Sequence, residues 1–74
     1  MSVLSRLDEH VLDFVAPDLP RSTEAIATLA GVPPEVVPWS LHRLRKRRLI
    51  EDDGSWSRWR RTPDGTRVLV EARR

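Results

Sequence analysis

The stretch PEVVPWSLHRLRKRRLIEDDGSWSRWRR, residues 34–61, decides the fold, because a helical pattern leads directly into a hairpin pattern. In its first half, Val37, Leu41 and Leu44 recur at helical spacing and so share one face of a helix, with Ser40 beside them. The opposite face carries charged or aromatic residues: Glu35, Trp39, His42, Arg43 and Lys46. A tryptophan on the side away from the core needs a partner or another explanation.

Pro38 lies inside this pattern, where a mid-helix proline costs about 3 kcal/mol or more. If the helix starts at Pro34 or Glu35, Pro38 falls in or just past the first turn. We therefore predict a loosened first turn, not a break.

The second half contains two predicted strands, residues 49–52 and 55–61, around Asp53 and Gly54, a pair that favours a tight hairpin turn. A turn centred there pairs Glu51 with Trp56 and Ile50 with Ser57. Alternation then gives an inner face with Ile50, Ser57 and Trp59 and an outer face with Trp56, Arg58 and Arg60. Trp59 is therefore predicted to be core and Trp56 to lie near the hairpin tip, where the alternative is packing against Glu51 and arginine stems.

Three further helices are predicted around this stretch. Residues 5–15 carry apolar residues at helical spacing, and Ser5 with Asp8 fits a capping box. A second helix is capped by Ser22 or Thr23 and stopped by Gly31. Its predicted buried side is Ala25, Ile26, Leu29 and Ala30. A closing helix begins at Thr62 and Pro63, with Val68, Leu69 and Ala72 as its apolar side, although Gly65 weakens this prediction.

The composition indicates one small domain, residues 1–74, with no cysteine for disulfides or thiolate metal sites. The start of the chain shows no leader pattern, and no apolar run approaches the roughly 18 residues of a membrane span. We therefore expect a cytoplasmic protein that does not enter a membrane.

The charge is divided unevenly along the chain. Residues 1–38 carry 2 basic and 6 acidic residues, whereas residues 39–74 carry 11 basic and 5 acidic residues, so the halves differ in sign at −4 and +6. Such polarity favours a polyanion on the C-terminal side. The alternative is a solvated charged surface with no partner.

Catalysis has little support in the sequence. His10 and His42 are isolated, with no cysteine in the chain and no histidine–acid spacing typical of a zinc site. There is no glycine-rich phosphate loop and no nucleophile motif. We predict no enzyme activity, no catalytic residue, no metal and no cofactor.

The segment LRKRRLIEDDGSWSRWRRTPDGTRVL resembles the corresponding part of MarR-type and PadR-type bacterial regulators. The resemblance implies an α+β winged helix-turn-helix: a three-helix core, a two-stranded wing and a short C-terminal helix. In such proteins the third helix enters the major groove and the wing touches the backbone or minor groove. Arg48 replaces the usual glycine at the end of the recognition helix, and Arg61 replaces the leucine before Thr62. The chain is too short for the families' dimerisation helices, so no small-molecule effector is evident, and a homodimer on DNA stays open.

Double-stranded DNA is the predicted partner, and each candidate residue has a stated role. Phosphate or groove contacts are assigned to Arg45, Lys46, Arg58 and Arg60, with the N–H groups of Ser22 and Thr23 as a further phosphate site. Arg43 is the candidate for guanine recognition, and His42 lies on the same outer face. Trp39 would press on thymine methyls or sugars, or pack against protein. Glu35 would accept from cytosine or, as we favour, complement the helix dipole.

Two functions from different classes follow from these residues. The first is a sequence-specific or semi-specific DNA-binding protein, acting as a transcriptional regulator or as an accessory factor of a phage or other mobile element. The second is a protein-interaction module in which Trp39, Trp56 and the arginines anchor a partner protein, since interfaces favour the same residue types.

Overall fold

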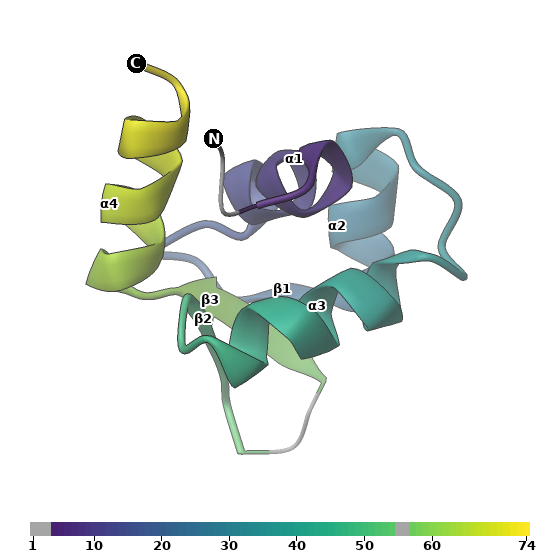
Figure 1. The fold of residues 1–74 in the computed structure, drawn as a ribbon. Helices are drawn as coiled ribbons and strands as arrows, with labels where there is room; N and C mark the ends of the chain where they lie inside the picture. The colour runs from purple at the N-terminus through teal and green to yellow at the C-terminus, as the bar shows by residue number, and fades with distance from the viewer. Residues whose placement is uncertain (1–3, 55–56) are drawn as a thin grey trace.

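A computed structural model describes residues 4–54 and 57–74 of the chain. Within these residues the chain forms four helices and a three-stranded sheet (Figure 1). In chain order the elements are α1 (Arg6–Phe14), β1 (Arg21–Ser22), α2 (Thr23–Ala30), α3 (Val37–Lys46), β2 (Ile50–Asp52), β3 (Arg58–Arg61) and α4 (Pro63–Ala72). This is the α+β winged helix-turn-helix architecture that the sequence predicts.

Helix α1 begins as predicted, because the Ser5 side chain accepts a hydrogen bond from the Asp8 N–H at 3.1 Å. Its apolar side supplies Val11 and Leu12 to the core, both fully buried. The core also takes in Ile26 from α2 and, from other elements, Val37, Leu41, Leu44, Ile50, Trp59 and Leu69. The four helices and the connected strands β2 and β3 thus share a single core cluster, to which β1 contributes no buried residue.

Helix α2 is capped by Ser22, whose hydroxyl accepts from the Ala25 N–H at 3.1 Å, and it ends at Gly31 with φ of 68°. The predicted buried side needs one correction. Leu29 is exposed and Ala27 is buried in its place. Because nearly every residue of this short helix is apolar, the sequence does not define a single buried direction.

Helix α3 starts later than predicted. Residues 34–36 form a turn, Val36 is the N-cap, and Pro38 lies at the second helical position. A backbone N–H at that position has no acceptor within the helix, so the N–H that proline lacks costs the helix no hydrogen bond. The expected conflict between Pro38 and the helix therefore does not arise, and neither does a loosened turn within the helix.

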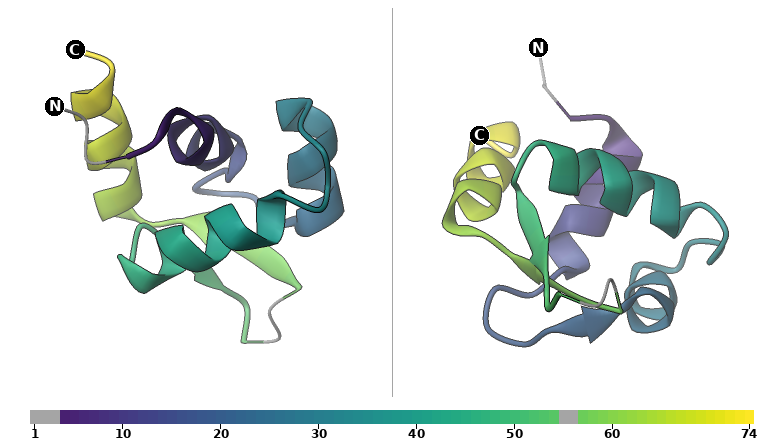
Figure 2. Two further views of the ribbon diagram at one scale, coloured as in Figure 1. Left: turned by 45° about the vertical axis from the view of Figure 1, so that its right-hand side comes forward. Right: turned by 90° about the horizontal axis from the view of Figure 1, so that it is seen from below.

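The sheet has the strand order β1-β3-β2, with both pairs antiparallel. Strand β1 was not predicted. It is two residues long, and Arg21 and Ser22 pair with Trp59 and Arg58 of the central strand. Figure 2 shows the sheet lying beside α3, with the hairpin of β2 and β3 running away from both chain ends.

The predicted hairpin register is wrong. Glu51 pairs with Arg60, and Asp52 pairs with Trp59. The two strands are therefore joined by a loop longer than a two-residue turn. Ser57, predicted on the inner face, lies before β3 and is exposed. Relative to the prediction the partner of Glu51 moves from position 56 to position 60, an even shift, so the residues within β2 and β3 keep their predicted faces. Trp59 is accordingly buried, at 3% exposure, and Arg58 and Arg60 are exposed.

Helix α4 begins at the predicted cap, with the Thr62 hydroxyl accepting from the Gly65 N–H at 3.0 Å. Gly65 is required here, because a Cβ at this position would overlap the carbonyl oxygen of Leu49. The preceding residue, Arg61, donates to the Leu12 carbonyl at 3.2 Å and to the Thr66 hydroxyl at 3.0 Å. A basic residue at a position usually apolar in similar proteins thus fastens α4 and β3 to α1.

Arg48 occupies the other position where the sequence departs from the MarR-type pattern. Its φ is 60°, the left-handed region that glycine adopts without strain. The glycine usual at this position matches the backbone conformation, and Arg48 accepts the same conformation at a cost.

Candidate nucleic-acid interface

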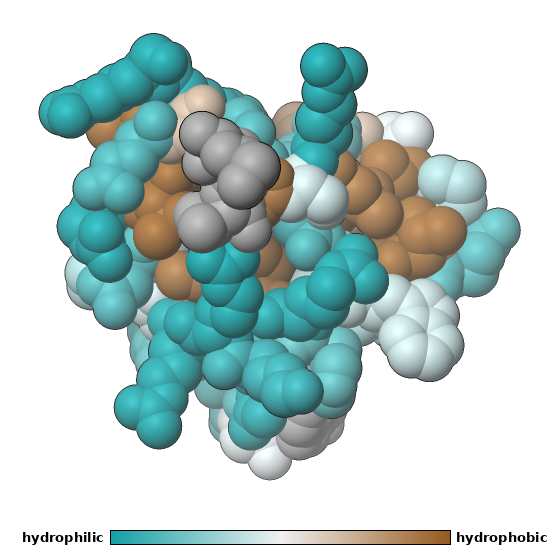
Figure 3. All heavy atoms as spheres, in the orientation of Figure 1, coloured by the Kyte–Doolittle hydropathy of each residue, from teal (hydrophilic) through white to brown (hydrophobic). Residues whose placement is uncertain are grey.

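The exposed face of α3 lies opposite its buried face, as the helical pattern predicts. Val37, Ser40, Leu41 and Leu44 are buried, whereas the outward side chains are in water. Trp39 is 70% exposed, and His42, Arg43, Arg45 and Lys46 are exposed as well. Hydrophilic side chains gather over α3 and the adjoining hairpin in the view of Figure 3.

Asp8 holds the middle of α3 against α1. Its buried carboxylate accepts from the Ser40 hydroxyl at 2.7 Å and from Arg43, at 2.9 Å from Nε and 2.7 Å from Nη2. Burial alone would raise the pKa of Asp8, but the hydrogen bonds from Arg43 and Ser40 outweigh it, and the pKa lies below its ordinary value. The bond to Asp8 in turn raises the pKa of Arg43.

Arg43 therefore has a structural contact that the sequence did not indicate. Two of its donors are committed to Asp8 while half of the side chain stays exposed. This geometry favours Arg43 as a residue that fixes the orientation of α3. Its contact with guanine stays a prediction.

The end of α3 is tied to the wing through Arg45. Its Nε lies 3.4 Å from Asp52 Oδ1, and the second carboxylate oxygen of Asp52 accepts from the Gly54 N–H at 3.1 Å. Asp52 thus links the helix to the turn of the hairpin. The sequence placed Asp52 at the end of the first predicted strand and did not indicate its link to α3.

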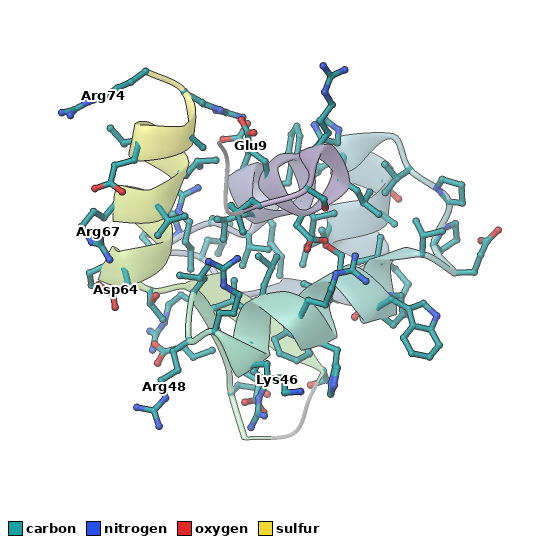
Figure 4. The ribbon with its side chains drawn as sticks, viewed as in Figure 1. Glu9, Lys46, Arg48, Asp64, Arg67 and Arg74 are labelled. Atoms are coloured by element: carbon teal, nitrogen blue, oxygen red, sulfur yellow. The ribbon has the colours of Figure 1, made fainter. Side chains whose placement is uncertain are left out.

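On the outer face of the hairpin, Arg60 donates from Nη2 to Glu51 Oε1 at 2.8 Å and from Nε at 3.1 Å. Both side chains are about half exposed, at 52% and 51%. Arg58 and Lys46 are different, since no carboxylate in the described part of the chain forms an ion pair with either. Figure 4 shows Lys46 directed toward the hairpin.

The start of α2 adjoins these elements. Ser22 uses its hydroxyl as the cap and pairs with Arg58 in the sheet. A shallow hollow of about 360 Å³ opens beside it, between α2, α3 and β3. It is lined by Thr23, Pro38, Trp39, Leu41, His42 and Trp59. The hollow brings three predicted site residues, Thr23, Trp39 and His42, to one place.

Two predicted site residues do not join this arrangement. Glu35 lies in the turn immediately before the N-cap of α3, outside the first turn of that helix, so its role with the helix dipole stays a prediction. Trp56 lies outside the described residues, so its assignment to the hairpin tip remains a prediction.

Within residues 4–54 and 57–74 no helix is both long and apolar enough to cross a bilayer. The same residues contain no group of three His, Asp or Glu side chains placed to hold a metal ion.

Comparison with known proteins shows the fold. No protein-family model matches the chain, and no curated protein matches it. The chain is similar to the solved structure of BpsR from Bordetella bronchiseptica, with a TM-score of 0.77 and 21% sequence identity. The match covers 92% of this chain and 52% of that one, so this chain spans about half the length of the BpsR chain. The BpsR structure concerns how 6-hydroxynicotinic acid regulates DNA binding of that protein.

This comparison corrects one expectation. The sequence offered no sign of a small-molecule effector, and the short chain argued against one. In BpsR, however, DNA binding is regulated by 6-hydroxynicotinic acid. The fold is therefore compatible with control by a small molecule, and the expectation that none applies is withdrawn.

Proposed function

We propose that this protein binds double-stranded DNA, with α3 in the major groove, the hairpin of β2 and β3 against the backbone, and the start of α2 at a phosphate. The observation that carries the proposal is the division of α3 into a fully buried face and an outward face that adjoins exposed wing arginines. The comparison with BpsR, a protein whose DNA binding is regulated, supports the same reading of this fold. The resemblance to MarR-type and PadR-type regulators supports it as well.

Phosphate contacts supply most of the affinity in such a complex, and they carry no sequence information. We assign them to Lys46 and Arg58 first, because neither has an acidic partner in the described residues, and then to Arg45 and Arg60. The N–H groups at the start of α2 add a phosphate site, since the first N–H groups of a helix lack acceptors within it.

We propose that side chains on the outward side of α3 contact the base edges. We propose that His42 lies in the groove and that Trp39 contacts thymine methyls or sugars from the rim of the hollow. Arg43 would orient the helix through Asp8 and use only its remaining donors toward DNA.

As a binding protein of this kind it would act in the cytoplasm without catalysis, as a transcriptional regulator or as an accessory factor of a phage or other mobile element.

The test is the salt dependence of binding to a generic duplex, followed by fluorescence anisotropy. With about four phosphate contacts, the logarithm of the affinity should fall against the logarithm of salt with a slope of roughly −3 to −4. Arg58→Gln should weaken binding and make the slope shallower by about 1, whereas Arg67→Gln, a matched loss of charge on α4, should not. Failure to bind duplex DNA at about 50 mM salt would contradict the proposal.

The protein-interaction module is the second candidate, and one observation favours it. Trp39 is 70% exposed, and tryptophan is enriched where proteins meet. If duplex DNA does not bind, this candidate takes precedence, and Trp39→Ala becomes the first variant to examine against candidate protein partners.

A further inference from the structure

Three of the arginines predicted to meet DNA each face an acid in the folded protein. Arg43 pairs with Asp8 at 2.7 Å, Arg45 with Asp52 at 3.4 Å and Arg60 with Glu51 at 2.8 Å. The positive surface that the sequence suggests is therefore partly neutralised from within.

The three acids differ in how readily they can release their arginines. The Asp8 side chain is 8% exposed and also accepts from Ser40, so its pair belongs to the core. Asp52 is 12% exposed and holds the Gly54 N–H. Glu51 is 51% exposed, and Arg60 is its only hydrogen-bond partner among the described side chains. Glu51 is thus the acid that can return to water with least disturbance of the structure.

Resting on the proposed function, we infer that Glu51 is a specificity-determining residue that competes with DNA phosphate for Arg60. Nε and Nη2 of Arg60 converge on one carboxylate oxygen, Oε1, at 3.1 and 2.8 Å. A phosphate oxygen offers the same charge and the same acceptor geometry. Binding therefore exchanges one anion for another at the guanidinium, while Glu51 becomes solvated.

The exchange has a defined effect on selectivity. Glu51 and Arg60 lie directly opposite each other in the hairpin, so the pair re-forms whenever no phosphate occupies the site. A poorly placed phosphate gains little over Glu51, whereas a well placed one replaces it fully. The acid accordingly lowers affinity for generic DNA more than for a duplex that fits the whole interface.

The chain offers a close control for this competition. Glu71 on α4 also pairs with an arginine, Arg67, at 3.4 Å, and its side chain is 55% exposed. Figure 4 places Arg67 on α4, away from the hairpin. Glu51→Gln and Glu71→Gln therefore remove the same charge from similarly exposed ion pairs, but only the first lies in the proposed interface.

The experiment measures the affinity of the full chain for a generic duplex at about 50 mM salt by fluorescence anisotropy. Glu51→Gln should tighten binding about threefold, a factor within the range of exposed ion pairs, while Glu71→Gln should change it by less than half as much. The affinity for a duplex recovered by selection, divided by the affinity for the generic duplex, should be smaller for Glu51→Gln than for the unaltered protein. An equal gain in both variants would reduce the effect to net charge and overturn the inference.

A second background separates competition from simple repulsion of DNA. In Arg60→Gln, the further change Glu51→Gln should lose most of its effect, because no guanidinium remains to be contested. If the full gain persists there, Glu51 acts by repelling phosphate and the competition is refuted. Absence of DNA binding by the unaltered protein would instead contradict the proposed function itself.

Discussion

Arg43 of α3 and Asp8 of α1 lie 35 residues apart in the chain and form two hydrogen bonds, at 2.9 and 2.7 Å, that fix the rotation of α3. The hydroxyl of Ser40, a fully buried residue that also lies on α3, donates a further hydrogen bond to the Asp8 carboxylate. The outward direction of Trp39 and His42 therefore depends on a polar contact as well as on the apolar face of α3.

Asp8→Asn should lower the free energy of unfolding at neutral pH by roughly 1 to 3 kcal/mol, because a buried hydrogen-bonded charge is lost from the network. Asp13 lies on the same helix as Asp8 and forms an exposed ion pair with Arg73, so Asp13→Asn should lower the free energy of unfolding by about 0.5 kcal/mol or less. Urea denaturation measures both. Comparable losses in the two variants would show that the buried network has no special weight.

The pH dependence follows from the lowered pKa of Asp8. A carboxyl whose folded pKa is depressed contributes stability above its unfolded pKa and loses it as the pH falls through the folded value. The difference between the unaltered protein and Asp8→Asn should therefore be complete at neutral pH and shrink below about pH 4. Acid titration of both, followed by circular dichroism, would reveal a constant difference if this reasoning is wrong.

Trp59→Ala should destabilise the protein by roughly 3 to 5 kcal/mol, since it removes a large side chain that is 3% exposed. Trp39→Ala should change stability by about 0.5 kcal/mol or less, because that side chain is 70% exposed. Thermal unfolding of the two variants tests the assignment of one tryptophan to the core and the other to the surface. Losses of similar size would contradict it.

For Gly65→Ala, helix propensity and packing predict changes in stability of opposite sign. Propensity alone predicts a gain of about 1 kcal/mol for alanine in a helix. The added Cβ would overlap the Leu49 carbonyl oxygen, so we expect a loss of roughly 1 to 3 kcal/mol instead. A measured gain would mean that α4 can move away from Leu49 at little cost.

Arg48→Gly should stabilise the protein by roughly 0.5 to 1 kcal/mol, because it relieves a φ of 60°. The neighbouring change Arg47→Gly should have the opposite sign, since Arg47 has an ordinary φ of −92° and glycine adds freedom only to the unfolded chain. Chemical denaturation of this pair checks the two signs together.

The helices could be predicted because their signals are local. Ser5, Ser22 and Thr62 each cap the helix that follows, and Gly31 ends one. The buried direction of α2 was less predictable, because Ala27 and Leu29 are both apolar and only the neighbouring elements decide between them.

The sheet and the ion pairs could be predicted only in part, because they depend on contacts between distant segments. Strand β1 has no pattern of its own and exists because β3 lies beside it. The faces of the residues within β2 and β3 were correct although the register was not, since the even shift preserves alternation, whereas Ser57 lies outside the strand and is exposed. Asp8 had a local explanation as the partner of the Ser5 cap, and nothing in the sequence indicated Arg43.

Ser22 belongs to two elements at once, as the last residue of β1 and as the cap of α2. Through β1 it pairs with Arg58, the first residue of β3, next to the hairpin loop. The distance between the start of α2 and the wing is therefore fixed by the covalent continuity of β1 with α2 and by the pairing of β1 with β3. In the proposed complex, a duplex whose phosphates do not match that distance would itself have to deform, and the energy of that deformation would give a sequence preference without any base contact.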